Sequence, residues 1–354
     1  MTIFFKVKTD SSSSSSKSSN KTLEKRISYF KSVNQHIQSL HKHDPYNCFK
    51  FNNDIIAIGN DNDKNHIILD KKIGTKSAYG SVFISHFRQP NGKILTFTTK
   101  VVDSSKNYNN IEANVLEFLT ELNVKYKICP NFPICYGVLR CNNFFQEQDK
   151  IKLNDKLNYK KLLFTFNELA DNDLFHLFDT KQYTSKIVLN ALSQIYMSIM
   201  FFHKHIQAYH TDCHAGNFLY HKIKPGGYFH YKINGNDYYI ENIGFLWVIW
   251  DFGLIVPFKK IKYPIEEDFI YNKKYPINYD YLYILKKGLN HFNVINTRYI
   301  YNSLIKYTHV YDLTKMPQLV EEVLALLVKY SDGCFLTSLP SRNSKIINRV
   351  AYQY

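Results

Sequence analysis

Two short polar segments, each placed directly after a strongly apolar one, constrain the fold of this chain more than any other feature. The first is Tyr209–Leu219, which follows a run whose apolar residues recur at helical spacing over about Ser185–His205. The second is Asp251-Phe252-Gly253, which follows the apolar run Phe245–Trp250, the pattern of a buried strand. Either polar segment alone would be a weak signal, but the two in this order, each behind a strongly apolar segment, are a strong one.

The spacing of the polar residues in these two segments is specific. Asp212 is followed five residues later by Asn217, in a loop that His210 opens, and Asp251 lies downstream. Phosphoryl transfer from ATP needs such a set, because one carboxylate orients the attacking hydroxyl while an amide and a second carboxylate hold Mg²⁺ on the phosphates. An amide oxygen and a carboxylate are also ligands that this hard cation prefers.

With H-x-D-x-x-x-x-N at His210–Asn217 and D-F-G at Asp251–Gly253, the chain resembles the protein kinase family, in a divergent eukaryotic-type serine/threonine form. The resemblance implies an α+β fold of two lobes, a small antiparallel β N-lobe and a mainly helical C-lobe, with ATP and Mg²⁺ as cofactors. It also implies a protein substrate with a Ser or Thr acceptor. The interval between Asp212 and Asn217 lacks the Ala-Ala-Arg or Arg-Ala-Ala of tyrosine kinases.

The resemblance assigns a role to each polar residue of the loop. Asp212 is the catalytic base or orients the substrate hydroxyl, and Asn217 and Asp251 coordinate Mg²⁺. His214 is expected to be catalytic, because it occupies the position of a Lys that neutralises the γ-phosphate. A histidine there would act either when partly protonated or as a hydrogen-bond donor. Thr211 replaces an Arg that receives an activation-loop phosphate, and residues 254–279 contain no Ser or Thr. We therefore predict no activation by Ser/Thr phosphorylation there.

A glycine-bearing turn and a strand lysine precede these loops. The turn, Gly-x-x-Ser-x-Tyr-Gly-x-Val, is similar to the phosphate-covering hairpin of the family, with Lys76 replacing its second glycine; it also fits an ordinary hairpin. Lys100 lies in the predicted strand Ile94–Val102, where an unpaired charge is costly, and a partner is expected on the predicted helix Asn109–Leu122. The nucleotide-binding residues implied here are Gly74, Ser77, Gly80, Val82, Lys100 and Glu112.

The predicted strand Leu162–Asn167 runs into Glu168–Leu174, and this junction resembles the hinge between the two lobes. The resemblance makes Phe166 the gatekeeper, lets the backbone from Asn167 to Leu169 bind adenine, and lets Asp173 reach the ribose. A strand-to-helix turn rich in Asp and Asn is also an ordinary helix cap. The further nucleotide-binding residues implied are Asn167, Leu169, Asp173 and Leu219.

Patterns outside the motifs define the expected domains. Residues 1–22 are a Ser-rich tail too polar to bury a core, and we expect disorder. Residues 23–64 are expected as a helical extension, because apolar residues recur at helical spacing up to Leu40. The kinase-like domain is then 65–354, with its N-lobe at 65–168 and its C-lobe at 169–354. In the C-lobe, Asn234-Gly235 predicts an inserted β-hairpin at 226–240, and Asp280 resembles a buried Asp that braces the catalytic loop.

Composition adds few constraints. The net charge of +15 is spread along the chain and is no strong signal for nucleic acid. No apolar run approaches the roughly 18 uncharged residues of a membrane helix, and the N-terminal apolar stretch is too short for a signal peptide. The cysteines lack the spacing of zinc knuckles and are expected to be reduced thiols. The expected location is cytoplasmic, in the host cytoplasm or the virion if the Asn-, Lys-, Ile- and Tyr-rich coding is that of a large DNA virus.

Two other functions fit parts of the same pattern. His-x-Asp-x-His-x-Gly-Asn also resembles the loop of aminoglycoside and choline phosphotransferases, which act on small molecules. A pseudokinase scaffold is compatible with the missing glycine, with Thr211 and with the absence of an Ala-Pro-Glu motif. The presence of Asp212, Asn217 and Asp251 argues against a scaffold.

Overall fold

The computed structural model describes residues 23–41, 49–52, 55–59, 66–73, 80–141, 161–259 and 274–354. Within these ranges the chain forms two compact units: unit 1 lies within 23–124 and 133–171, and unit 2 within 125–132 and 172–354. Both units combine helices with mostly antiparallel strands, which confirms the mixed α+β class. The predicted tail 1–22, Gly74 and Ser77 lie outside the described residues.

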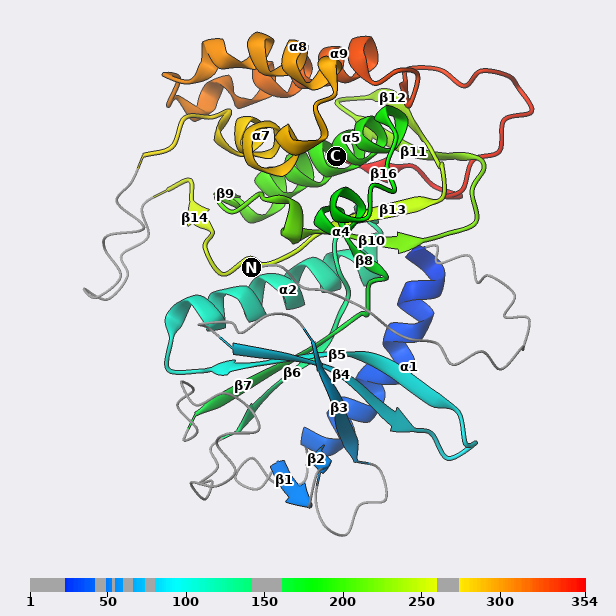
Figure 1. The fold of residues 1–354 in the computed structure, drawn as a ribbon, viewed down its shortest axis with the longest axis vertical. Helices are drawn as coiled ribbons and strands as arrows, with labels where there is room; N and C mark the ends of the chain where they lie inside the picture. Colours follow the sequence, from blue (N-terminus) through cyan, green and yellow to red (C-terminus); the bar gives the residue numbers. More distant parts are fainter. Residues whose placement is uncertain are drawn as a thin grey trace. The chain divides into compact units, whose positions relative to one another are not determined.

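Unit 1 is built on a curled antiparallel sheet of seven described strands in the order β1-β2-β3-β4-β5-β7-β6 (Figure 1). All six residues of β7 are buried, as expected of an apolar strand inside a sheet. The strands are β1 (Phe49–Asn52), β2 (Ile55–Ile58), β3 (Ile67–Ile73), β4 (Gly80–Arg88), β5 (Ile94–Asp103), β6 (Cys135–Cys141) and β7 (Leu162–Asn167).

Two helices, α1 (Leu23–His41) and α2 (Asn107–Tyr126), cover opposite faces of this sheet. Ile37 of α1 packs so closely on Gly137 of β6 that a Cβ there would lie 3.0 Å from Ile37 Cγ2. Ala113 of α2 packs in a cluster that includes Val138, the next residue of β6. Since neighbouring residues of a strand point to opposite faces, each helix buries its own face.

The range 23–64 differs from the helical extension expected there. α1 is present as the expected helix, but β1 and β2 follow it and extend the sheet beyond β3. Four-residue strands are too short to show a clear period of two, and pairing with β3 decides their conformation. The helix and both strands therefore belong to unit 1 itself.

Unit 2 is organised around α5 (Ser185–Ile206), whose residues from Val188 to His203 are all buried. Thr184 caps its start by accepting a hydrogen bond from the N–H of Ile187, and Gln207 ends it in the left-handed conformation. By length and composition α5 could cross a membrane, but 83% of its apolar window is buried within the protein. A core helix passes the same test, and this burial is what the sequence pattern predicted.

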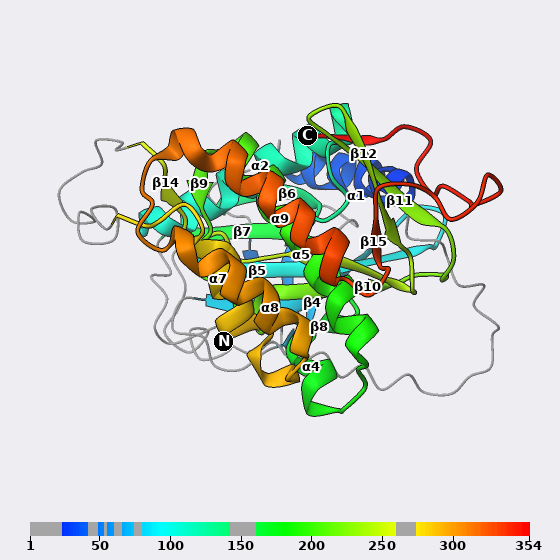
Figure 2. The ribbon, with the colours of Figure 1, turned by 90° about the horizontal axis from the view of Figure 1, so that it is seen from above.

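The other elements of unit 2 surround α5. Helices α8 and α9 pack side by side (Figure 2). In the described part of this unit the strands pair in the orders β13-β10-β8, β15-β12-β11-β16 and β14-β9. The elements are β8 (Asn172–Asp173), α4 (Leu174–Asp179), β9 (Ala208–Tyr209), β10 (Phe218–Lys222), β11 (Tyr228–Ile233), β12 (Asn236–Glu241), β13 (Phe245–Ile249), β14 (Val256–Pro257), α7 (Tyr279–Tyr283), α8 (Ile295–Leu304), α9 (Met316–Tyr330), β15 (Phe335–Leu336) and β16 (Tyr352–Gln353).

The hairpin predicted at 226–240 is present as β11 and β12. Its turn residues Asn234 and Gly235 both have positive φ, 49° and 83°, as a two-residue hairpin turn requires. The hairpin does not stand alone, because β15 pairs with β12 and β16 pairs with β11. Residues from the C-terminal part of the chain thus complete a four-stranded sheet that the sequence pattern did not indicate.

Candidate functional site

The buried carboxylate of Asp280 holds the start of the loop His210–Asn217. Its Oδ2 accepts a hydrogen bond from His210 N–H (2.8 Å), and its Oδ1 accepts one from Thr211 N–H (2.9 Å). His203 Nε2 lies 2.7 Å from Oδ2. Burial by itself raises the pKa of Asp280, but these donors outweigh burial and hold the pKa below its ordinary value. Asp280 is therefore an ionised brace for the loop backbone.

Thr211 has a strained backbone, with φ at +63°, which is rare for a β-branched residue. Two hydrogen bonds maintain it: the N–H donates to Asp280, and Oγ1 donates to the carbonyl oxygen of Leu254 at 2.5 Å. The loop is thus tied directly to the segment after Gly253, at the position where the resemblance expected an Arg and a phosphate. Strain of this kind persists where the surroundings over-determine it, most often at functional sites.

Asp212 and Asn217 are brought together within this loop. Asn217 Nδ2 donates to Asp212 O (2.9 Å) and to Asp212 Oδ2 (3.1 Å). A single 3₁₀ turn at Ala215–Asn217 bends the chain so that the amide reaches back over five residues. Since both of these contacts use the amide nitrogen, Oδ1 is the atom of Asn217 with which the side chain can bind a cation.

His214 is positioned as a hydrogen-bond donor towards Asp212. Its Nδ1 accepts a hydrogen bond from Gly216 N–H (3.1 Å), so the proton of the neutral ring is on Nε2, which lies 3.6 Å from Asp212 Oδ2. Burial lowers the pKa of His214, although the carboxylate of Asp212 opposes the effect. The ring is therefore neutral at pH 7, which favours the donor role over neutralisation of a phosphate.

The second polar segment is joined to the first by its backbone. Trp250 N–H donates to Asn217 O (2.9 Å), and His210 Nε2 lies 3.0 Å from Trp250 O. The next residue, Asp251, has φ at +63°, a second strained non-glycine position. The carboxylates of Asp212 and Asp251 are both close enough to His214 to affect its pKa. The backbone of the loop therefore lies directly beside that of Trp250, the residue before Asp251.

Asn217 and Asp251 are the residues that could hold a cation here. An amide oxygen and a carboxylate suit Mg²⁺, which commonly binds one or two carboxylates and completes its shell with water and phosphate oxygens. In the described part of the chain, no group of three or more His, Cys, Asp or Glu side chains could hold a metal ion. A cation held by Asn217 and Asp251 would take its other ligands from water and phosphate oxygens.

Asp173 and Leu219 lie beside this loop, on paired strands. β8 and β10 are hydrogen-bonded with Asp173 opposite Leu219. Asp173 Oδ1 accepts a hydrogen bond from His176 N–H (2.8 Å) and so caps α4. Its Oδ2 is buried and has no hydrogen-bond partner among the described residues. Burial raises the pKa of Asp173 to about 7.

Asp173→Asn should make the protein more stable at pH 8. The folded-state pKa of about 7 lies above the ordinary 3.8, so wild-type stability falls as pH rises from about 4 to 7. Asn caps a helix as well as Asp does and does not ionise. We expect the two proteins to be about equally stable at pH 4.5, and the variant to gain on the order of 2 kcal/mol at pH 8.

Urea unfolding of both proteins at the two pH values measures this difference. Asp332→Asn, at an exposed carboxylate, is the matched control and should show no such pH-dependent gain. A difference between wild type and Asp173→Asn that does not change with pH contradicts a buried, protonated Asp173.

In unit 1, Lys100 and Glu112 form a buried ion pair. Lys100 Nζ lies 2.7 Å and 2.6 Å from the two carboxylate oxygens of Glu112. Both side chains are buried, so neither charge would be tolerated there without the other. Val82 pairs with Lys100 across β4 and β5 and therefore lies on the same face of the sheet.

Gly80 has a structural reason to be glycine that does not involve phosphate. A Cβ at this position would lie 2.6 Å from both Val101 O and Val102 Cγ1 on the neighbouring strand. The close approach of β4 to β5 therefore excludes a side chain at Gly80. The first glycine of the predicted turn, Gly74, lies outside the described residues.

The prediction that Phe166 is the gatekeeper is wrong. In the register of β5 and β7, Lys100 pairs with Thr165, and Phe166 pairs with Thr99. Paired residues share a face and neighbouring residues do not, so Phe166 points away from the Lys100 face. The residues on that face are Thr165 and Asn167, and Asn167 Oδ1 is buried without a partner among the described residues.

Part of the backbone expected to bind adenine is already occupied. Thr98 Oγ1 donates to Asn167 O (3.1 Å), and Glu168 N–H donates to Ile134 O (2.9 Å). The following residues, Leu169 and Ala170, make no backbone hydrogen bond within the described ranges. If this segment binds a ligand edge through its backbone, Leu169 and Ala170 supply the groups.

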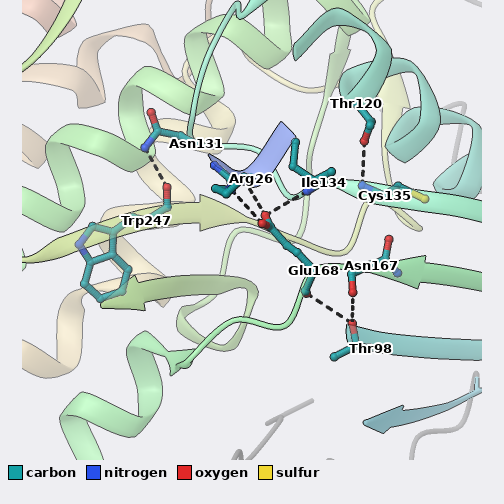
Figure 3. Close-up of polar contacts among 9 residues, drawn as sticks. All are labelled: Arg26, Thr98, Thr120, Asn131, Ile134, Cys135, Asn167, Glu168 and Trp247. Atoms are coloured by element: carbon teal, nitrogen blue, oxygen red, sulfur yellow. Dashed lines mark hydrogen bonds and ion pairs between the residues drawn. The ribbon is translucent and has the colours of Figure 1, made fainter. Parts of the chain in front are cut away.

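A buried polar network that the motif analysis missed supports the strand leading to Asp251. Among the described strands β13 is at the edge of its sheet, and two side chains bind the backbone of Trp247 there. Asn131 Nδ2 donates to Trp247 O (2.8 Å) (Figure 3), and Gln194 Oε1 accepts from Trp247 N–H (3.0 Å). Asn131 Oδ1 also accepts from Tyr231 OH (2.7 Å). Local spacing carries no signal for contacts between residues this far apart in sequence.

The cysteines differ in part from expectation. Cys129, Cys135, Cys213 and Cys334 are buried and are not disulfide-bonded. Cys141 is disulfide-bonded, so the prediction of reduced thiols does not hold at this position. Burial raises the pKa of Cys213 well above its ordinary value, which keeps this neighbour of Asp212 a protonated thiol.

No protein-family model matches the chain. The chain is 26% identical over 140 residues to "Uncharacterized protein 011L" of Invertebrate iridescent virus 3. The matched region covers 38% of this chain and 19% of that protein. It is 27% identical over 200 residues to "Probable serine/threonine-protein kinase 380R" of Invertebrate iridescent virus 6. The matched region covers 52% of this chain and 35% of that protein. The chain thus matches about a third or less of the length of either relative. The second similarity supports a kinase-like relationship and no finer assignment.

Proposed function

We propose that the chain is an ATP-dependent phosphotransferase that acts as a serine/threonine protein kinase. The observation that carries the proposal is the geometry of the loop at Thr211, a β-branched residue that Asp280 helps to hold at φ +63°. Such strain is stored where function needs it. Hydrogen bonds join the side chain of Asn217 to Asp212. They also join the backbone of Asn217 to that of Trp250, the residue before Asp251. The similarity to a probable viral serine/threonine kinase points in the same direction.

In this proposal each residue of the loop acts through an atom already described. Asp212 accepts the proton of the substrate hydroxyl or orients that hydroxyl, while Asn217 Nδ2 and the Nε2–H of His214 hold the carboxylate in place. Asn217 Oδ1 and the carboxylate of Asp251 would hold Mg²⁺. When bound, that ion neutralises charge on the phosphates.

Lys100 would contact the α and β phosphates, with Glu112 fixing its ammonium group. Asp173 would reach the ribose, and Val82 and Leu219 would pack against the nucleotide. In the same proposal, unit 1 corresponds to the N-lobe and unit 2 to the C-lobe of a two-lobed kinase-like fold. Residues 23–58 then belong to the N-lobe, because they contribute α1, β1 and β2 to its sheet.

An assay with radiolabelled ATP tests the proposal. We expect transfer of the γ-phosphate to a generic protein acceptor such as casein or histone, with phosphate on Ser or Thr, and loss of transfer when EDTA removes Mg²⁺. Aminoglycosides and choline belong in the same assay, because His214 follows Asp212 by two residues as in small-molecule kinases. Labelling of those acceptors alone would replace the protein kinase with a small-molecule kinase. ATP binding without transfer to any acceptor would favour a scaffold.

A further inference from the structure

The N-terminal helix α1 covers one face of the sheet, and it also makes a polar contact that this packing does not need. Arg26 on its first turns forms a buried, two-pronged ion pair with Glu168, the residue directly after β7 (Figure 3). Nε donates to Oε2 at 2.8 Å, and Nη2 donates to Oε1. The exposed fractions are only 5% for Arg26 and 6% for Glu168.

Glu168 is also held by its other polar atoms. Its Oε1 accepts a hydrogen bond from Ile134 N–H (3.0 Å), and its own N–H donates to Ile134 O (2.9 Å). Thr98 Oγ1 lies 3.1 Å from Asn167 O and 3.5 Å from Glu168 O. The residue is thus fixed to α1, to the start of β6 and to β5, all within unit 1.

A buried ion pair is a poor way to gain stability, because desolvating two charges costs about as much as their attraction returns. What a bidentate Arg–carboxylate pair adds is orientation, since its two parallel hydrogen bonds allow one geometry. The pair therefore restricts where Glu168 and the residues bonded directly to it can lie.

The two residues that follow Glu168 have backbone groups that could bind a ligand. Leu169 and Ala170 make no backbone hydrogen bond within the described part of the chain, and they lie between Glu168 and Asp171, the last residue of unit 1. In the proposed function their backbone groups would bind the adenine edge. Their placement depends on the residue before them, and Arg26 holds that residue.

We propose that Arg26 is a positioning residue for the nucleotide: through Glu168, α1 sets the backbone of Leu169 and Ala170, and so sets the affinity for ATP. The inference rests on the proposed function for its ligand, but the positioning itself is a property of unit 1. α1 would then be a required part of the nucleotide site that nucleotide-contact motifs alone do not reveal.

Three variants of the full-length protein test this. Arg26→Met keeps the length of the side chain and removes the charge, Arg26→Lys keeps the charge without the fork, and Glu168→Gln keeps the shape of the partner. Tyr29→Phe is the matched control on the same helix. It removes the hydrogen bonds of Tyr29 OH with Thr96 O (2.9 Å) and Thr96 N (2.8 Å), which lie on β5 away from Glu168.

We expect Arg26→Met and Glu168→Gln to raise KM for ATP by roughly 10-fold, with kcat within about 2-fold of wild type, because misplacement of a binding group weakens binding. Arg26→Lys should have a KM for ATP between that of these two variants and that of wild type. Tyr29→Phe should lower the melting temperature and leave KM for ATP unchanged. If Arg26→Met does not fold, Arg26→Lys and Glu168→Gln carry the test.

Hydrogen exchange of the ligand-free protein separates this inference from the proposed function. We expect faster amide exchange at Leu169 and Ala170 in Arg26→Met and Glu168→Gln, and unchanged exchange there in Tyr29→Phe. An unchanged KM together with unchanged exchange at 169–170 would overturn the inference, even if wild type is an active kinase. If wild type binds no ATP but exchange at 169–170 is faster in the two variants, the result would support the positioning of this backbone by Arg26. The same result would overturn the assignment of ATP as its ligand.

Discussion

Replacing Asp212 with Asn should reduce phosphoryl transfer by roughly 10² to 10⁴-fold, the usual contribution of a general base or orienting carboxylate. Asn keeps an oxygen that can accept the hydrogen bond which Asn217 Nδ2 now donates to Asp212 Oδ2 (3.1 Å). The loop therefore keeps its shape. What the variant loses is the negative charge that attracts the hydroxyl proton and that the Nε2–H of His214 faces at 3.6 Å.

The affinity for Mg-ATP should remain close to that of wild type, because the residues proposed to hold the nucleotide and the metal are unchanged. Steady-state kinetics and an ATP titration of the same samples separate the two effects. Asp332→Asn is a suitable control, since Asp332 is exposed and has a left-handed backbone, φ +54°, that Asn adopts readily. An Asp212→Asn protein that transfers phosphate at the wild-type rate would remove Asp212 from the chemistry.

Replacing Asp280 with Ala should destabilise unit 2 by roughly 3 to 5 kcal/mol and abolish activity. The substitution leaves the N–H groups of His210 and Thr211 and the ring of His203 without their acceptor, in a site that excludes water. It also removes one of the two hydrogen bonds that hold Thr211 at φ +63°. The loop loses both its anchor and its strained geometry.

Asp280→Asn should cost less than Asp280→Ala, because the amide oxygen can still accept one of the backbone hydrogen bonds. The pH dependence gives a further check. The folded-state pKa of Asp280 is depressed, so its contribution is present above the ordinary pKa of 3.8 and is lost as pH falls below it. Urea unfolding from pH 7 to pH 3 should therefore show a smaller loss of stability in Asp280→Asn than in wild type. An equal loss in both proteins would mean that Asp280 does not carry this charge.

Several elements and the core of the candidate site follow from local sequence. The strand at Leu162–Asn167 has the predicted bounds, and the helix expected over about Ser185–His205 is Ser185–Ile206, because strong periodicity over a full element outweighs its surroundings. Asp212 and Asn217 are five residues apart, a distance that one turn of chain can close. The burial of Asp280, by contrast, was implied by the resemblance to the protein kinase family and not by local sequence.

The tertiary structure decided whatever depends on register or on residues far apart in the chain. Phe166 lies on the face opposite Lys100 because the pairing of β5 with β7 is set by the whole sheet, and a shift of one residue exchanges the faces. Arg26 meets Glu168 across 142 residues, and Asn131 meets Trp247 across 116. Sequence periodicity extends over two to four residues, so it predicts which face of an element is buried. Which side chain from another element meets that face depends on how the core packs, and only the folded chain determines that.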